Sequence, residues 1–210
     1  MTSKRLSQPV DVVREIYGEQ FPLINRYVDI LATTGINWGL LGPREANRLW
    51  DRHILNSAAL SQLIAAGSTV VDVGSGAGLP GIPLTLLRPD ARMTLLEPLL
   101  RRSKFLRLAL TELDIADRVE VVRARAEDHH QSYDVVVARA LAPLDRLIGW
   151  CNPLRGAGGV ILALKGDSAG EEIRAATRQL ELARLDAEVL RVQAHPEVEP
   201  AIVVRLAARN

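Results

Sequence analysis

A short apolar segment followed by four closely spaced glycines places the strongest limit on how this chain folds. Residues 69–73 read Thr-Val-Val-Asp-Val, which is typical of a buried strand, and glycines follow at positions 74, 76, 78 and 81. Glycine permits positive φ angles and lets a ligand approach the bare main chain. A helix is predicted from about Pro80, because proline suits the first helical turn. This strand, glycine loop and helix N-terminus favour binding of a nucleotide-like ligand with an acidic end.

Two acidic residues make this interpretation more specific than an ordinary glycine turn. Asp72 lies two residues before Gly74, where its carboxylate can organise an ammonium group or the loop amides. Glu97 ends a second predicted strand, Met93–Glu97, where a carboxylate can accept from ribose hydroxyls. The dinucleotide pattern Gly-x-Gly-x-x-Gly is only partly matched, and no P-loop lysine follows. The candidate ligand-binding residues here are Asp72, Gly74, Gly76, Gly78 and Glu97.

From Thr69 onward, predicted strands alternate with predicted helices. The strands are expected at 69–73, 93–97, 118–122, 133–138 and 159–164, with a closing pair at 185–193 and 201–207. The helices between them are expected at 80–88, 99–113, 143–152 and 168–183. Such alternation predicts right-handed crossovers and an open, parallel α/β sheet. Ligands of such sheets bind at the carboxyl ends of the strands, so the residues there are the candidates for chemistry.

A helical section precedes the first strand. Apolar residues recur at helical spacing over 9–20 and 22–34, a loop follows at 35–43, and a third helix is expected over about 44–66. We therefore predict two parts, a helical N-terminal cap at 1–66 and a ligand-binding core at 67–210.

Composition limits the class of protein. Apolar residues make up 48% of the 210 residues, enough for a packed core, and the single cysteine, Cys151, suits a reducing compartment. The N-terminus lacks the apolar stretch of a signal peptide, and no run approaches the roughly 18 apolar residues of a membrane span. We expect a cytoplasmic protein that does not contact membranes. The net charge of +1 does not by itself indicate a nucleic-acid partner.

Basic residues at the predicted strand ends are more informative than the net charge. They are Arg123, Arg125, Arg139 and Lys165. Arg139 directly follows an almost wholly apolar strand, so it is expected either to contact a ligand or to pair with Glu127 or Asp134. Lys165 is expected either to contact a ligand or to cover apolar surface with its stem.

Other charged groups have an ordinary interpretation beside a functional one. Arg101, Arg102 and Lys104 lie on the polar face of a predicted helix, which is either solvated or in contact with phosphates. His53, next to Arg52, is either a half-buried structural residue or part of a binding surface. No histidine has partners at metal-ligand spacing, so we expect no metal site.

Several motifs together carry a resemblance to a known family. The loop at 72–78 resembles the S-adenosylmethionine loop of class I methyltransferases. The further motifs are Gly-Leu-Pro-Gly-Ile-Pro-Leu at 78–84, Arg-Ala-Glu-Asp at 125–128, Ala-Arg-Ala at 138–140, Leu-Lys-Gly at 164–166 and Arg-His-Ile-Leu-Asn-Ser at 52–57. Over nearly its whole length the chain resembles the bacterial 16S rRNA guanine-N7 methyltransferases, the methyltransferase G or glucose-inhibited division protein B family.

The resemblance implies a Rossmann-like class I methyltransferase sheet, mostly parallel with the last strand antiparallel, and an N-terminal helical extension. It implies S-adenosyl-L-methionine as cofactor and a guanine in the decoding-region loop of 16S rRNA as substrate, within the small ribosomal subunit or its precursor. In this family pattern Gly74 and Leu79 hold the methionine side of the cofactor, Glu97 fits the ribose, and Ala126 and Glu127 meet the adenine. Arg139 then lies at the boundary between cofactor and substrate.

We expect Arg139, supported by Lys165, to grip the guanine or a flanking phosphate as the catalytic pair. The expected RNA-binding residues are Arg52, His53, Arg101, Arg102, Lys104, Arg123 and Arg125. We expect a monomer. The sequence departs from the family pattern at Asn37 and Asn56, whose roles stay open. The alternatives are a NAD-dependent oxidoreductase, a non-catalytic RNA-binding or ribosome-assembly factor on the same fold, and a small-molecule methyltransferase.

Overall fold

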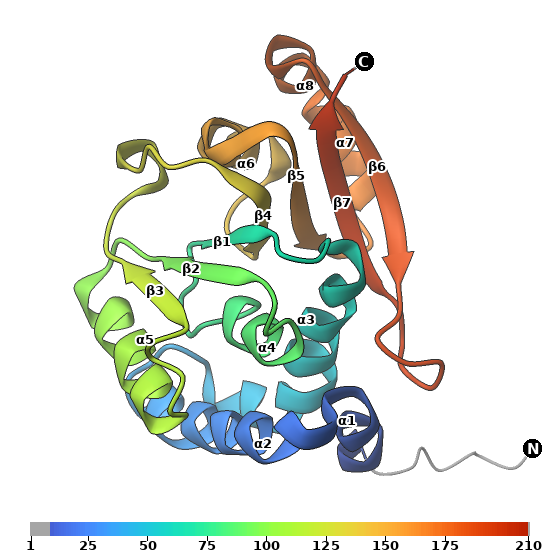
Figure 1. The fold of residues 1–210 in the computed structure, drawn as a ribbon. Coiled ribbons are helices and arrows are strands. Elements are labelled where there is room, and N and C mark those ends of the chain that lie inside the picture. Colours follow the sequence, from blue (N-terminus) through green and yellow to red (C-terminus); the bar gives the residue numbers. More distant parts are fainter. Residues whose placement is uncertain (1–8, 210) are drawn as a thin grey trace, which may run out of the picture.

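A seven-stranded sheet forms the centre of the protein in the computed structural model, which describes residues 9–209 (Figure 1). The first eight residues of the predicted cap, and Asn210, lie outside the described residues. The strand order is β3-β2-β1-β4-β5-β7-β6. The strands are β1 (Thr69–Val73), β2 (Arg92–Leu96), β3 (Val119–Val122), β4 (Tyr133–Arg139), β5 (Arg155–Lys165), β6 (Leu185–Val192) and β7 (Ala201–Ala208).

Strand direction agrees with the expectation drawn from the resemblance. Strands β1 to β5 pair in parallel, whereas β7 pairs antiparallel with both β5 and β6. From β1 the chain first builds outward through β2 to β3 and then returns to place β4 on the other side of β1. The order therefore reverses between β1 and β4, and ligands of open α/β sheets bind at such a switch point.

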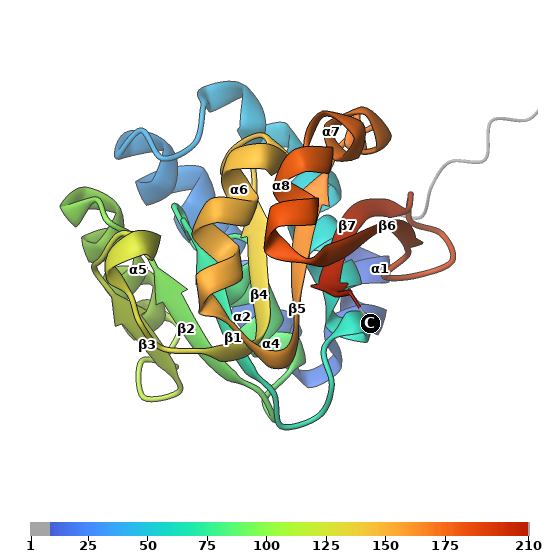
Figure 2. The ribbon, with the colours of Figure 1, turned by 90° about the horizontal axis from the view of Figure 1, so that it is seen from above.

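Helices cover both faces of the sheet, as Figure 2 shows, with α6 and α8 on one face and α2 and α4 on the other. The helices between the strands are α4 (Gly81–Leu87), α5 (Leu100–Glu112), α6 (Leu144–Cys151), α7 (Ala169–Ala175) and α8 (Thr177–Ala183). Because side chains alternate along a strand, Val71 and Val73 join the core beneath α6 and α8, and Val70 joins the other core. Asp72 therefore points to the α4 side, where it meets Gly81.

Two helix predictions need correction. The helix expected over 44–66 is a series of short turns: a 3₁₀ segment Pro43–Arg48, a π-helical segment Leu49–Leu55, α3 (Asn56–Ala59) and a second 3₁₀ segment Leu60–Leu63. The helix expected over 168–183 divides into α7 and α8 around Ala176. Apolar periodicity predicts a helical path, but it does not report which carbonyl each amide bonds to.

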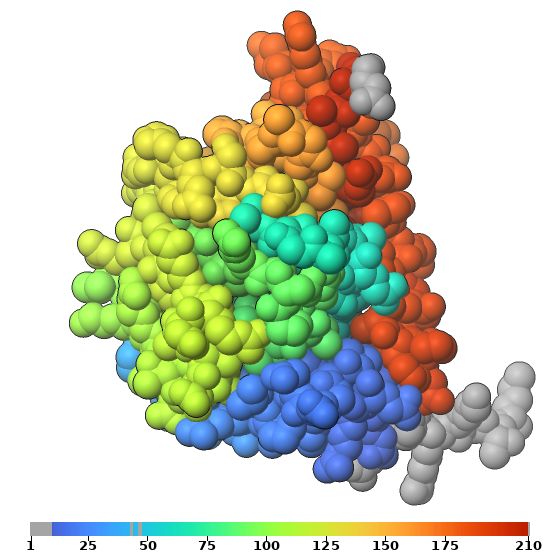
Figure 3. All heavy atoms as spheres, in the orientation of Figure 1, coloured from blue at the N-terminus to red at the C-terminus, as the bar shows by residue number. Residues whose placement is uncertain are grey.

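Of the N-terminal helices α1 (Pro9–Tyr17) and α2 (Phe21–Ile30), α2 packs against α4 and α1 against the segment Leu49–Leu55. Their buried side chains share one hydrophobic core with β1, α4 and α5, and Figure 3 shows the blue N-terminal residues directly against green residues of the α/β part. The described part of the chain holds no helix long and apolar enough to cross a membrane. The division into 1–66 and 67–210 stays a prediction.

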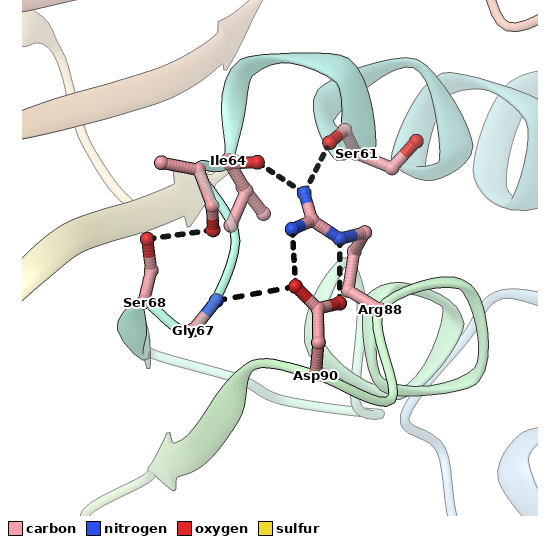
Figure 4. Close-up of polar contacts among 7 residues, drawn as sticks. Ser61, Ile64, Gly67, Ser68, Arg88 and Asp90 are labelled. Carbon is pink, nitrogen blue, oxygen red and sulfur yellow. Dashed lines mark hydrogen bonds and ion pairs between the residues drawn. The ribbon is translucent and has the colours of Figure 1, made fainter.

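A charged clamp ties the end of the N-terminal section to the turn after α4 (Figure 4). Arg88 donates to both carboxylate oxygens of Asp90, at 2.9 and 2.7 Å, and to the main-chain oxygens of Ser61 and Ile64. Asp90 also accepts from the Gly67 amide at 3.2 Å. These bonds hold the pKa of Asp90 well below its usual range, and they fix the approach to β1.

Candidate functional site

The glycine loop leaves β1 at the switch point of the sheet and is fixed to β2. The amides of Gly74 and Ser75 both donate to the Leu96 carbonyl oxygen, at 2.8 and 3.2 Å. Gly74, Gly76 and Gly78 have φ angles of 71°, 57° and 94°, in the region that favours glycine. These backbone conformations explain why glycine occupies the three positions.

The N-terminal helix α2 supports the loop from below. The Tyr27 hydroxyl, fully buried, donates to the Ala77 carbonyl oxygen at 2.6 Å. A Cβ atom on Gly78 would come within 2.9 Å of this hydroxyl and 2.5 Å of the Ile82 Cδ1 atom. Sequence reasoning missed Tyr27, since its only signal was an aromatic residue on the apolar face of a helix.

Asp72 is completely buried beneath the loop. Its Oδ2 atom accepts from the Gly81 amide at 3.0 Å, so the carboxylate organises the first turn of α4. Its Oδ1 atom is buried and has no hydrogen-bond partner. Burial is the main reason that the pKa of Asp72 rises to about 7. The unpaired oxygen and the raised pKa fit a position that a cationic group of a ligand completes.

Glu97 follows β2 and connects the loop to α5. Its Oε2 atom accepts from the Gly76 amide at 3.0 Å and its Oε1 atom from the Leu99 amide at 2.9 Å, while Arg102 lies 3.8 Å away. The residue is only 1% exposed. Each carboxylate oxygen keeps a second lone pair, with which it can still accept from a hydroxyl.

A cavity of about 180 Å³ opens beside Gly74 and Glu127. It is lined by Val73, Gly74, Leu96, Pro98, Ala124, Arg125, Ala126, Glu127, Leu141 and Trp150. The lining joins loops after β1, β2, β3 and β4, so it collects residues from four neighbouring strand ends. A mostly apolar cavity with a few polar groups is typical of a small-molecule site.

Arg139 is the last residue of β4, and its partner differs from both residues considered from the sequence. Its Nη2 atom donates to the Nδ1 atom of His53, and its Nη1 atom is buried without a hydrogen-bond partner. Pairing with Asp134 is wrong, because that carboxylate accepts from the amide and hydroxyl of Thr69 at 2.8 and 2.7 Å. Glu127 is exposed and lines the neighbouring cavity instead.

His53 has an environment that does not fit the expected direct contact with RNA. The residue is 5% exposed, and its Nε2 atom lies 2.6 Å from the Glu45 Oε2 atom. Burial and the charge of Arg139 lower the pKa of His53 to about 4, so the ring is neutral near pH 7. With both ring nitrogens engaged by protein groups, neither is free for a phosphate or a base.

Lys165, at the end of β5, is paired rather than solvated. Its Nζ atom donates to Glu172 Oε2 at 2.6 Å and to the Ala142 carbonyl oxygen at 2.8 Å. Lys165 thereby holds the segment after β4, where Ala140 has a φ of 49°, a conformation that costs a non-glycine residue about 1–2 kcal/mol. Backbone strain of this kind concentrates at functional sites.

A larger cavity of about 720 Å³ lies between Arg139 and Lys165. Its lining also includes Arg52, Asn56, Ala140, Ala142, Pro143, Leu164, Gly166 and Glu172. Three cations from the N-terminal section, β4 and β5 therefore meet around one opening. Of the cavities described in this section, this one is lined by the most basic residues expected from the sequence.

The other expected RNA-binding residues lie on the surface. Arg101 and Lys104 line a cavity of about 420 Å³ with Trp38 and Leu100. Arg102, Arg123 and Arg125 are exposed. Within residues 9–209, no cluster of three His, Cys, Asp or Glu side chains is arranged to hold a metal ion.

The fold of the site is shared with solved methyltransferases. The ribosomal protein L11 methylase of Lactobacillus delbrueckii subsp. bulgaricus matches with a TM-score of 0.59 at 16% identity, covering 74% of this chain and 77% of that one. A SAM-dependent O-methyltransferase of Thermotoga maritima matches with a TM-score of 0.56 at 16% identity, covering 79% and 70%. Similarity at this level establishes the fold alone.

Sequence similarity is much closer. The family model described as rRNA small subunit methyltransferase G matches residues 20–202. A protein of Thermobifida fusca (strain YX) is 49% identical over 199 residues, which cover 93% of this chain and 83% of that protein. One of Mycobacterium marinum is 47% identical over 206 residues, covering 95% and 90%, and both are named ribosomal RNA small subunit methyltransferase G. This chain belongs to the rRNA small subunit methyltransferase G family and is an S-adenosylmethionine-dependent methyltransferase.

Proposed function

We propose that this enzyme methylates N7 of a guanine in the decoding-region loop of 16S rRNA, acting on the small ribosomal subunit or its precursor. The names of its relatives support an rRNA substrate. The observation that carries the proposal is the buried, unpartnered Nη1 atom of Arg139 beside a cavity that Arg52 and Lys165 also line. Membership of this family excludes the NAD-dependent alternative, because the family consists of methyltransferases.

The residues present fit this cofactor. The unpaired Oδ1 atom of Asp72 suits the ammonium group, and a Cβ atom on Gly74 would lie 2.5 Å from the Leu141 Cδ1 atom at the wall of the adjacent cavity. We assign the methionine side of the cofactor to Asp72, Gly74, Gly76, Gly78 and Leu79, the ribose to Glu97, and the adenine to Ala126 and Glu127. When bound, the cofactor supplies a methyl group already activated on a positively charged sulfur.

The reaction needs alignment more than proton transfer. Guanine N7 carries a free lone pair at neutral pH, so no base has to remove a proton before the N7–methyl bond forms and the methyl–sulfur bond breaks. The positive charge passes from sulfur to the guanine ring. In well-oriented systems, holding the two reactants in line lowers the activation barrier by roughly 7–11 kcal/mol.

Arg139 is the residue that we assign to the guanine. A buried cationic N–H without a partner is costly, so an acceptor from the substrate is expected there. The planar fork of arginine matches the O6 acceptor of guanine, or a flanking phosphate. Lys165 supports this contact by holding Ala142 at the same opening. We keep both as the proposed catalytic pair.

The remaining cations form the proposed RNA surface. They are Arg52, Arg101, Arg102, Lys104, Arg123 and Arg125. Because the target base has to reach the loop at the switch point, we expect it to be splayed from its stack. Contacts to phosphates release counterions, so the affinity for RNA should fall linearly with salt on a logarithmic scale.

The decisive experiment incubates the purified enzyme and S-adenosylmethionine with small ribosomal subunits or 16S rRNA from cells that lack the enzyme. Mass spectrometry of nuclease fragments should locate one new methyl group on guanine N7. Methylation at another atom would contradict the assignment to N7. RNA binding without transfer would favour the assembly-factor alternative, and salt-independent methylation of small molecules would favour the small-molecule alternative.

Asp72 gives a pH-dependent prediction for cofactor binding. Its pKa is about 7 without a ligand, and a nearby ammonium group favours the ionised form, so binding should release a proton. The affinity for S-adenosylmethionine should therefore rise as pH increases through about 7. Calorimetry of wild type and Asp72→Asn across this range checks it, since the variant should bind more weakly and show a flatter pH dependence.

The raised pKa of Asp72 also predicts how the stability of the fold depends on pH. Its folded pKa, about 7, is above the ordinary aspartate value of 3.8, so the folded state binds more protons between these values. The free energy of unfolding of the ligand-free enzyme should therefore fall as pH rises through this window, and Asp72→Asn should reduce that fall. Asp134→Asn is the matched control. Hydrogen bonds from Thr69 lower the pKa of Asp134, which lies near the start of β4, at the opposite end of the strands from Asp72. A wild-type profile matching Asp72→Asn in both assays would contradict the role of Asp72.

A further inference from the structure

Two residues of the N-terminal section form a hydrogen-bond chain that ends at Arg139: His53 contacts its guanidinium, and Glu45 contacts His53. His53 lies in the π-helical segment Leu49–Leu55, and Glu45 lies in the 3₁₀ segment before it. We propose that His53 and Glu45 are positioning residues, which fix the direction of Arg139 so that its Nη1 atom is presented to the RNA substrate. The inference rests on the proposed function, because it assigns Arg139 to the guanine.

The hydrogen bonds run in one direction through three side chains. Arginine has no acceptor, so the contact between Arg139 Nη2 and His53 Nδ1 requires a lone pair on Nδ1. Glu45 has only acceptors when ionised, so the 2.6 Å contact at the other ring nitrogen requires a proton on His53 Nε2. Only the neutral ring with its proton on Nε2 satisfies both neighbours. Glu45 therefore selects the tautomer that Arg139 needs.

The charges around the ring agree with this state. His53 faces Arg139 from β4, and Glu45 and Arg52 from its own section of the chain. Burial and Arg139 lower the pKa of His53 to about 4, which keeps the ring neutral at physiological pH. Glu45 accepts from His53, and this bond lowers the pKa of its carboxyl, so the acceptor is ionised.

Anchoring one nitrogen of a planar guanidinium determines where the other one points. Arg139 Nη1 stays buried and unpartnered, although the charge of Asp72 acts on the same guanidinium and the Oδ1 atom of Asp72 is also unpartnered. Without the bond to His53, the direction of Nη1 would no longer be fixed. The contact with His53 therefore keeps Nη1 available for the substrate.

The test compares two amides at position 53. Asn places its side-chain oxygen near the position of His Nδ1 and keeps an acceptor for Arg139, whereas Gln places its amide group near Nε2 and lacks that acceptor. We expect His53→Gln to lower kcat for RNA methylation by about 10- to 100-fold, because misplacement of a reacting partner has effects of this size. His53→Asn should keep most of the activity. Both variants should bind S-adenosylmethionine as wild type does.

Glu45 gives an independent pair of variants at a less buried residue. Glu45→Gln keeps an oxygen that accepts from His53 Nε2, and Glu45→Ala does not. Nitrogen NMR of the labelled ring should show the Nε2-protonated tautomer in wild type and Glu45→Gln, and a mixture of tautomers in Glu45→Ala. kcat should decrease only in Glu45→Ala, with thermal unfolding confirming that each variant is folded.

The outcomes separate this inference from the function on which it depends. If wild type fails to methylate RNA, the proposed function is wrong, while the tautomer still tests the hydrogen-bond chain. If wild type is active but His53→Gln and His53→Asn lose the same activity, or Glu45→Gln falls as far as Glu45→Ala, the positioning role is wrong.

Discussion

Arg139→Ala is expected to fold and to bind S-adenosylmethionine, but to lose about 10²- to 10³-fold in kcat, the usual effect of removing one aimed hydrogen-bond donor. The reason is that Arg139 lines the same cavity as Arg52 and Lys165 and has a buried Nη1 atom without a partner. Removal also leaves His53 Nδ1 without its donor, so the free energy of unfolding should fall by about 1–3 kcal/mol. Single-turnover methylation of small-subunit rRNA at saturating RNA measures the first effect, and denaturant unfolding the second.

Two control variants define the interpretation. Arg139→Lys keeps the charge and loses the planar guanidinium, so it should bind RNA with an affinity near that of wild type but retain little of the wild-type kcat. Arg205→Ala removes an exposed cation of β7 that pairs with Glu188 at 2.7 Å, and it should leave kcat unchanged. Methylation by Arg139→Ala at the wild-type rate would remove Arg139 from the reaction.

Gly74→Ala is expected to abolish most cofactor binding while leaving the fold intact. An added Cβ atom would lie 2.5 Å from the Leu141 Cδ1 atom, at the wall of the cavity assigned to the cofactor. Either Leu141 moves into that cavity or the methyl group itself occupies the approach to the loop. We expect the dissociation constant for S-adenosylmethionine to rise at least about tenfold, a loss of about 1.4 kcal/mol in binding free energy.

Gly67→Ala is the matched control for backbone strain. Gly67 has a φ of 73°, close to the 71° of Gly74, but a Cβ atom there meets nothing within 4 Å. Both variants should lose about 1–2 kcal/mol of folding stability, because alanine is strained in this conformation. Only Gly74→Ala should lose cofactor affinity in calorimetry. Equal affinities in the two variants would show that the loop backbone is not the binding surface.

The N-terminal section contributes to the site as well as covering the sheet. Tyr27 supports the glycine loop by its bond to Ala77, His53 accepts from Arg139, and Glu45 accepts from His53. All three residues lie before β1, outside the motifs at the strand ends of the α/β part. Truncation of this section would therefore remove support from both the cofactor loop and the proposed catalytic arginine.

The sequence by itself predicted the strands, the glycine loop and the edge where the site lies. These depend on local preferences: apolar residues in short runs, glycines at positive φ and polar residues at strand ends all act through near neighbours in the chain. The sequence predicts β5 from 159, whereas the strand begins at Arg155, which pairs with Tyr133 before a shift in register. The glycines after Arg155 hide this start, because glycine weakens a strand pattern. The last antiparallel strand came from the resemblance and is confirmed by the pairing of β7 with β5.

Only the tertiary structure decided which groups the site residues meet. Arg139 and His53 are 86 positions apart, and charge alone favoured Glu127 or Asp134 as the partner of Arg139. The π-helical turn that places His53 in the interior has no signature in apolar spacing, because the period of the side chains does not reveal the hydrogen-bond register of the backbone. Lys165 likewise meets the Ala142 carbonyl oxygen, 23 positions away in the segment after β4. Such contacts arise between distant segments, so they follow from how the whole chain packs rather than from the preferences of any one stretch.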